Sequence, residues 1–240
     1  MSLLSNLVEL VVLSNQKSLN QSTNERGYCS LLTPKWEELA GKLKHQVRVA
    51  YVDTEGGPVP SAIGQIQGTP TIRAFVPKRS SARNEKQMLN YDSAREVGDL
   101  VRFATANMPN YVERVASEAE ANAVAAKASG WGLPRVLVFS EKGPGASTSN
   151  LLKALSSEFR RRVLIVEVRK HPRTDAIATE HGVDTLPTLL CLDPTSRTPT
   201  NRFQGKDPTP GRLSTFVGKC ALGKPVLSKP AAEQGTKEEL

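Results

Sequence analysis

The sequence predicts an α/β protein made of two similar domains. Two runs, VRVAYVD (residues 47–53) and VLIVEVR (residues 163–169), are apolar on both sides, which is typical of strands covered by helices on both faces. Each run is followed by a strand that opens with a proline, Pro70 in the first half and Pro187 in the second. From Val47 to Pro70 the chain advances 23 residues and from Val163 to Pro187 it advances 24, which indicates an internal repeat.

The first half contains the elements of one copy. Residues 7–13 predict a buried strand, and a helix follows that ends near Leu43. Apolar residues recur at helical spacing in that helix and place Trp36 in the core. The strand at 47–53, a short helix, the strand in GTPTIRAF and a closing helix in YDSAREVGDLVRFATA complete the copy.

The second half repeats this order after an alanine-rich helix, residues 112–128, and the strand PRVLVFS. LLKALSSEFRRR predicts a helix before the strand at 163–169, and RLSTFVGKCA predicts the last helix. We therefore expect domains at residues 1–108 and 109–222. Pro, Ser, Lys and Glu dominate from Gly223 onward, which predicts a flexible tail at 223–240.

Composition limits the possible functions. The formal charge of +8 and a pI near 9.5 permit binding to nucleic acid, but the basic residues are scattered and no nucleic-acid motif accompanies them, so we expect no such partner. No run of about 18 apolar residues predicts a membrane span. The first apolar run has no preceding basic residues and is interrupted by Glu9, so it is a poor secretory signal. Three cysteines cannot all pair within one chain.

Three motifs in the first half resemble those of one family. GYCSLLTPKWEELA resembles G-H-C-K-x-L-A-P-x-W-x-x-L-A, GTPTIRAF is similar to G-x-P-T-x-x-x-F, and YDSAREVGDLVRF is similar to Y-x-G-x-R-x-x-x-x-L-x-x-F. These are motifs of the protein disulfide isomerase family. The resemblance implies two tandem thioredoxin-like domains, the first incomplete at its N-terminus and the second similar to the non-catalytic domains of that family.

The same resemblance assigns a degenerate redox site. Cys29 matches the second cysteine of the C-x-x-C pair, whereas the attacking position holds Arg26. We expect Cys29 at the N-terminus of its helix, where the helix dipole and unpaired backbone N–H groups favour the thiolate. Arg95 matches an arginine that lowers the thiol pKa, and Glu9 matches a buried carboxylate that relays protons. Residues 12–24 look like an insertion between Glu9 and the site.

Peptide-binding positions also follow from the resemblance. The family places cis prolines at the positions of Pro70 and Pro187, where the preceding backbone, at Thr69 and Leu186, can pair with an extended peptide. Tyr28 adjoins the thiol and joins these candidates. An ordinary edge proline at either position is the alternative. Cys191, inside LLCL, is expected to be a buried and unreactive thiol, since apolar surroundings raise a thiol pKa. The resemblance implies no cofactor and no metal.

The chain ends in KEEL, which resembles the K-D-E-L retrieval signal of the endoplasmic reticulum and consists of Lys237, Glu238, Glu239 and Leu240. We therefore expect the endoplasmic reticulum lumen and a retrieval receptor, or the cytosol if no signal peptide precedes this sequence. Two hypotheses stay open: a disulfide isomerase-like protein with impaired redox activity toward client proteins, and a redox-inactive, chaperone-like module that binds peptides. Nucleic-acid binding is the third and least supported.

Overall fold

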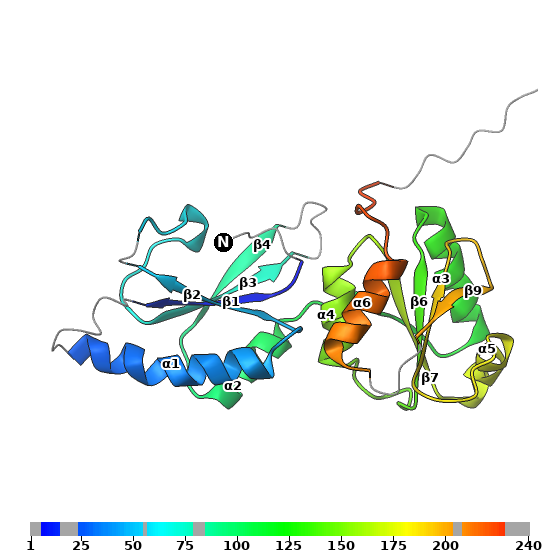
Figure 1. The fold of residues 1–240 in the computed structure, drawn as a ribbon, viewed down its shortest axis with the longest axis horizontal. Coiled ribbons are helices and arrows are strands. Elements are labelled where there is room, and N and C mark those ends of the chain that lie inside the picture. The colour runs from blue at the N-terminus through cyan, green and yellow to red at the C-terminus, as the bar shows by residue number, and fades with distance from the viewer. Residues whose placement is uncertain (1–5, 15–23, 55–56, 79–84, 204–207, 229–240) are drawn as a thin grey trace, which may run out of the picture. The chain divides into compact units, whose positions relative to one another are not determined.

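The computed structural model describes residues 6–14, 24–54, 57–78, 85–203 and 208–228, and, of residues 24–28, the helical backbone alone. The chain divides into two compact units, residues 1–110 and 111–240. Each unit contains one mixed sheet with helices packed against it (Figure 1).

The first unit has a four-stranded sheet in the order β2-β1-β3-β4. In chain order its elements are β1 (Glu9–Ser14), α1 (Asn24–Lys42), β2 (Arg48–Asp53), a 3-10 helix (Ser61–Ile63), β3 (Thr71–Pro77), β4 (Lys86–Tyr91) and α2 (Val97–Ala106). β1 pairs in parallel with β2 and antiparallel with β3. α1 and α2 pack together on one side of the sheet (Figure 1).

The second unit has a five-stranded sheet in the order β5-β7-β6-β8-β9. Its strands are β5 (Glu113–Val115), β6 (Arg135–Ser140), β7 (Leu164–Arg169), β8 (Thr188–Leu192) and β9 (Pro199–Arg202). Its helices are α3 (Glu118–Trp131), α4 (Asn150–Glu158), a 3-10 helix (Pro172–Thr174), α5 (Asp175–Glu180) and α6 (Pro210–Cys220). β6 takes the place of β1, since it pairs in parallel with β7 and antiparallel with β8.

Alternation along the central strands explains the layering. In β6, Val136 and Val138 face the core under α4 and α6, whereas Leu137 and Phe139 face the core under α3 and α5. Figure 1 shows these two helix pairs on opposite sides of the sheet. The first unit repeats the alternation, with Val11 and Leu13 in contact with Ile63 of the 3-10 helix. Trp36 is buried as expected, and its indole N–H donates to the Ala50 carbonyl at 3.2 Å.

Three details differ from the sequence expectations. β4 and β9 are edge strands that the sequence pattern does not separate from the loops and helices beside them. α3 begins at Glu118, because residues 113–115 pair with β7 and the Ser117 side chain caps the helix by accepting from the Glu120 N–H. Finally, residues 12–14 belong to β1, so only the part of the expected insertion that lies outside the described residues, 15–23, separates strand from helix.

Candidate functional site

Cys29 lies within α1 and not at its N-terminus. It is the sixth residue of a helix that begins at Asn24, and its side chain is 6% exposed. The helix dipole acts mainly on the first turn, so Cys29 does not occupy the helix position that the sequence analysis expected. The reason for the difference is that residues 24–28 are themselves helical and extend α1 by more than a turn. The side chains of Arg26 and Tyr28 lie outside the described part of the chain.

Arg95 and Pro70 are brought together. The Arg95 guanidinium donates from Nη2 to the Pro70 carbonyl at 3.0 Å, just before α2 begins. The Thr69–Pro70 peptide bond is cis, Pro70 is buried, and Thr69 is half-buried. Arg95 is otherwise exposed. The arginine expected to approach the thiol therefore holds the loop that enters β3.

Glu9 is buried at the start of β1 with a basic partner of its own. Its carboxylate lies 3.0 Å from Lys86 Nζ of β4, and the two side chains are 4% and 5% exposed. Burial lowers the pKa of Lys86, whereas the adjacent Glu9 opposes that shift. The chain leaves β1 toward α1 at Ser14, about 17 Å further along the strand at about 3.3 Å per residue. Glu9 is thus engaged with the edge strand of the sheet.

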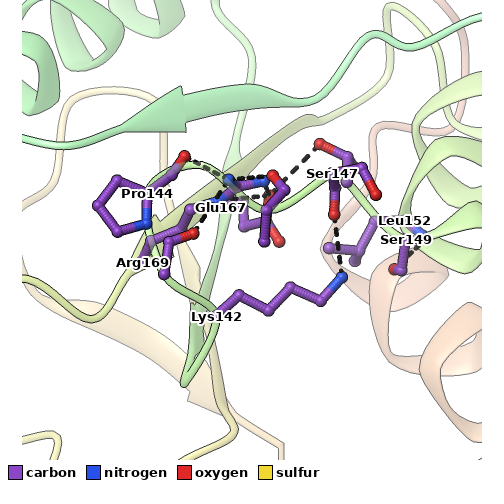
Figure 2. Close-up of polar contacts among 10 residues, drawn as sticks. Lys142, Pro144, Ser147, Ser149, Leu152, Glu167 and Arg169 are labelled. Atoms are coloured by element: carbon purple, nitrogen blue, oxygen red, sulfur yellow. Dashed lines mark hydrogen bonds and ion pairs between the residues drawn. The ribbon is translucent and has the colours of Figure 1, made fainter.

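In the second unit, the loop between the central strand β6 and helix α4 corresponds in chain order to the segment between β1 and Cys29 in the first unit. Residues 141–149 connect β6 to α4, and Figure 2 shows Arg169 of β7 reaching into this loop. Its guanidinium donates to the carbonyls of Gly143 at 3.3 Å, Pro144 at 2.7 Å and also Ala146. The loop thereby has its backbone carbonyls satisfied by a side chain.

A buried carboxylate holds that arginine in place. Glu167 Oε2 accepts from Arg169 Nη2 at 2.8 Å and Nε at 3.2 Å, and from the Thr148 hydroxyl at 3.4 Å (Figure 2). Both charged side chains are fully buried or nearly so. This loop contains no cysteine, and the arrangement is a structural anchor with no group for thiol exchange. Nearby, the Leu186–Pro187 bond is cis, with Leu186 half-buried and Pro187 exposed.

The prediction that Cys191 is a free thiol is wrong. Cys191 forms a disulfide with Cys220, which joins β8 to the last residue of α6, and the two Cα atoms are 6.0 Å apart. Burial of Cys191 was expected and is observed. The physical reason for the error is that α6 packs on the face of β8 that carries Cys191, a contact between segments 29 residues apart. Cys29 is left as the one unpaired cysteine of this sequence.

Comparisons with known proteins agree with this fold. A protein of Dictyostelium discoideum named as a protein disulfide-isomerase is 25% identical over 181 residues, which are 75% of this chain and 42% of that protein. Protein disulfide isomerase-like 2-3 of Oryza sativa subsp. japonica is 38% identical over 78 residues, 32% of this chain and 16% of that protein. The crystal structure of ERdj5 covers 90% of this chain with a TM-score of 0.63 at 17% identity, over 27% of its own length, which shows a shared fold. The chain has a thioredoxin-like fold and is similar in sequence to members of the protein disulfide isomerase family.

This chain spans less than half the length of those two relatives. No protein-family model matches it. Both of its units are thioredoxin-like, with the mixed α/β architecture that the sequence predicts. Within the described residues, no cluster of three or more His, Cys, Asp or Glu side chains is placed to bind a metal, and no helix has the length and apolar character needed to cross a bilayer. Lys237, Glu238, Glu239 and Leu240 lie outside the described residues.

Several residues that shape the site were not found from the sequence. Lys86 lies in the edge strand β4, which the sequence did not predict, so nothing in the sequence indicated that Lys86 pairs with Glu9. Glu167 and Arg169 alternate with valines in VLIVEVR. Two charged residues within an otherwise buried run could have indicated a buried ion pair, because buried charges need partners. Cys220 stands near the end of a helical pattern, and nothing in its spacing indicates a partner in β8.

Proposed function

We propose that this protein acts on the thiols and disulfides of folding client proteins in the endoplasmic reticulum, with a redox activity that is impaired because Arg26 replaces the attacking cysteine. The observation that supports this most directly is that Cys29 is the one cysteine not engaged in a disulfide. The Cys191–Cys220 disulfide supports an oxidising compartment. A terminal KEEL sequence supports retrieval by a receptor in that compartment.

The chemistry left to a single thiol is limited. A Cys29 thiolate that attacks a client disulfide forms a mixed disulfide and releases one client thiolate. Resolution needs a second thiolate to attack the Cys29 sulfur or the client sulfur, and no second free thiol exists in this sequence. Release of the Cys29 thiolate therefore needs attack on the client sulfur by another client thiolate or by an external thiol such as glutathione, and the external route is bimolecular and slow.

Restoring the missing thiol tests this proposal. Arg26→Cys in the whole chain should raise insulin disulfide reduction by orders of magnitude, because an intramolecular resolving step replaces a bimolecular one. Arg26→Ser is the matched control, since it removes the same guanidinium without adding sulfur. The gain should vanish in Arg26→Cys combined with Cys29→Ser. Strong activity in the unmodified protein would contradict the proposal.

A redox-inactive, chaperone-like module that binds peptides is the second candidate, and the 6% exposure of Cys29 favours it. The two candidates differ in what Cys29→Ser does. If the thiol takes part, mass spectrometry should detect client proteins trapped as mixed disulfides on the unmodified chain and none on the variant. If the module only binds, extended peptides should bind both proteins with equal affinity and no trapped species should form.

A further inference from the structure

A cavity of about 200 Å³ lies in the second unit between the sheet and the helices α3 and α5. Part of its wall is apolar, with Val115, Leu137, Ile177 and Leu192 among the lining residues. Arg135 and His181 also line it. Six or seven water molecules, at about 30 Å³ each, would occupy the same volume, so the cavity has room for a small organic molecule.

Arg135 brings a buried charge to this cavity. It is the first residue of β6, its side chain packs under the helices, and the residue is 7% exposed. Nη2 donates to the Ser196 carbonyl, but Nε has no hydrogen-bond partner. In the part of the chain that the structure describes, no carboxylate forms an ion pair with it. A buried charge without a counter-ion is costly, because burial removes the solvation of the guanidinium.

The equivalent position in the first unit shows what is missing. Glu9 opens β1 opposite Phe75 of β3, as Arg135 opens β6 opposite Leu192 of β8. In the first unit, Met88 of β4 faces Phe75, and Lys86, the ion-pair partner of Glu9, stands two residues before Met88. In the second unit, Pro199 of β9 faces Leu192, and Arg197 stands two residues before Pro199. The first unit thus has a carboxylate and an amine where the second has two guanidinium groups.

The acidic side chains at the cavity do not neutralise Arg135. Glu118 and Glu180 are exposed at its rim, and Glu180 pairs with Arg197 at 4.0 Å. Burial and the neighbouring Arg197 lower the pKa of Arg135, against an opposing effect of Glu180. His181 provides a second unsatisfied atom on the same wall, since its Nδ1 is buried without a hydrogen-bond partner. Arg135 Nε and His181 Nδ1 are thus two buried, unsatisfied nitrogen atoms of residues that line one cavity.

We propose that this cavity binds a small organic anion, a carboxylate carried on an apolar body, with the carboxylate at Arg135 and His181 and the apolar body against the sheet. The charge-assisted bond to Arg135 supplies orientation. The apolar wall favours a hydrocarbon group over a bare inorganic anion. This site is independent of Cys29 and of the proposed thiol chemistry.

Benzoate is the probe, and benzamide is its neutral isostere. Titrated into the whole chain, benzoate should shift the Arg135 Nε–H resonance and bind at least tenfold more tightly than benzamide. It should also raise the melting temperature in proportion to its occupancy. Equal affinity for benzoate and benzamide, or benzoate shifts confined to other residues, would overturn the proposal. If inorganic phosphate binds as tightly as benzoate, the apolar part of the proposal is wrong.

Variants locate the site. Arg135→Gln should weaken benzoate binding at least tenfold, whereas Arg135→Lys keeps a charge and should retain part of the affinity. Arg173→Gln, an exposed arginine of the second unit that does not line the cavity, is the matched control and should change affinity much less. Unchanged affinity in Arg135→Gln would refute the proposal. If Arg135→Gln does not fold, the resonance shift and the comparison with benzamide, both measured on the unmodified chain, still test whether the cavity binds a carboxylate.

Discussion

Glu9 in the first unit and Glu167 in the second are both buried carboxylates with a basic partner, but they hold different parts of their units. Glu9 pairs across the sheet with Lys86 of the edge strand β4 through one close contact. Glu167 pairs with Arg169 two residues along the same strand, and that arginine reaches three carbonyls of the loop after β6. The first pair secures an edge of the sheet, whereas the second secures a loop.

This difference teaches how a shared fold is specialised. The loop held by Arg169 occupies, in the second unit, the place that the thiol segment takes in the first. A segment tied to the sheet by a buried ion pair is suited to be a rigid scaffold. In the first unit the buried pair, Glu9 and Lys86, instead joins two strands. We therefore expect the second unit to depend more strongly on its buried ion pair than the first.

Arg169→Met should have the largest effect and tests that expectation. It leaves Glu167 buried without a counter-ion and removes donors from the loop, so the second unit should lose about 3–5 kcal/mol of unfolding free energy. Urea unfolding followed by Trp131 fluorescence, in a Trp36→Phe background, reports the second unit alone. Adding Glu167→Leu should recover part of the loss. A cost below about 1 kcal/mol would contradict the anchoring role of the pair.

Cys220→Ser is expected to come next. The disulfide closes a segment of 29 residues, and removing such a constraint from the unfolded chain typically costs about 2–4 kcal/mol. The same Trp131 assay measures it. Cys29→Ser is the matched control, since it removes a sulfur from the other unit. If reduction of the unmodified protein leaves the Trp131 transition unchanged, the cross-link contributes nothing.

Lys86→Met should destabilise the first unit by a smaller amount, about 2–3 kcal/mol, because Lys86 makes one charge-assisted contact where Arg169 makes several. Trp36 fluorescence in a Trp131→Phe background follows this unit. Combining it with Glu9→Leu should restore most of the loss, since no buried charge then remains unpaired. A cost equal to that of Arg169→Met would remove the distinction between the two pairs.

The smallest effect concerns pH and the second unit. Burial lowers the pKa of His181 below its usual value of 6.5, Arg135 adds to the shift, and Glu180 opposes it. The unfolded chain therefore binds a proton before the folded chain does, so stability should fall as the pH drops from about 6.5 through the folded pKa. His181→Phe should flatten this part of the profile, measured by the Trp131 transition at several pH values. An unchanged slope would show that other groups cause it.

The elements that the sequence predicted are those with strong internal signals. The runs 47–53 and 163–169 both contain strands, and β7 is buried throughout as expected, whereas β2 is at the edge of its sheet and only half-buried. β4 was not recognised, because most of its residues are polar, each is exposed or half-buried, and its pairing with β3 is set by the tertiary structure. The alternating pattern of a half-exposed edge strand is too weak in six residues to stand out from a loop.

The candidate site was predictable only in part for a similar reason. The motif around Cys29 and the prolines could be read locally, and the structure joins Arg95 to Pro70. The depth of Cys29 in α1 depends on where the helix begins, and element boundaries are the least certain part of a sequence pattern. Ion pairs such as Glu9–Lys86, and the Cys191–Cys220 disulfide, join segments distant in sequence, so they need the fold before they can be found.

The position of Cys220 at the end of α6 has a mechanical consequence. A force applied at the C-terminus, by a translocating unfoldase or by an experimenter, reaches the disulfide once residues 222–227 are pulled from their hydrogen bonds to Arg161 and Arg162. The covalent bond then passes the load directly to β8, which lies between β6 and the edge strand β9, without first detaching α6. Unfolding from this end therefore requires shearing the sheet, whereas a reducing environment would allow α6 to be peeled away first.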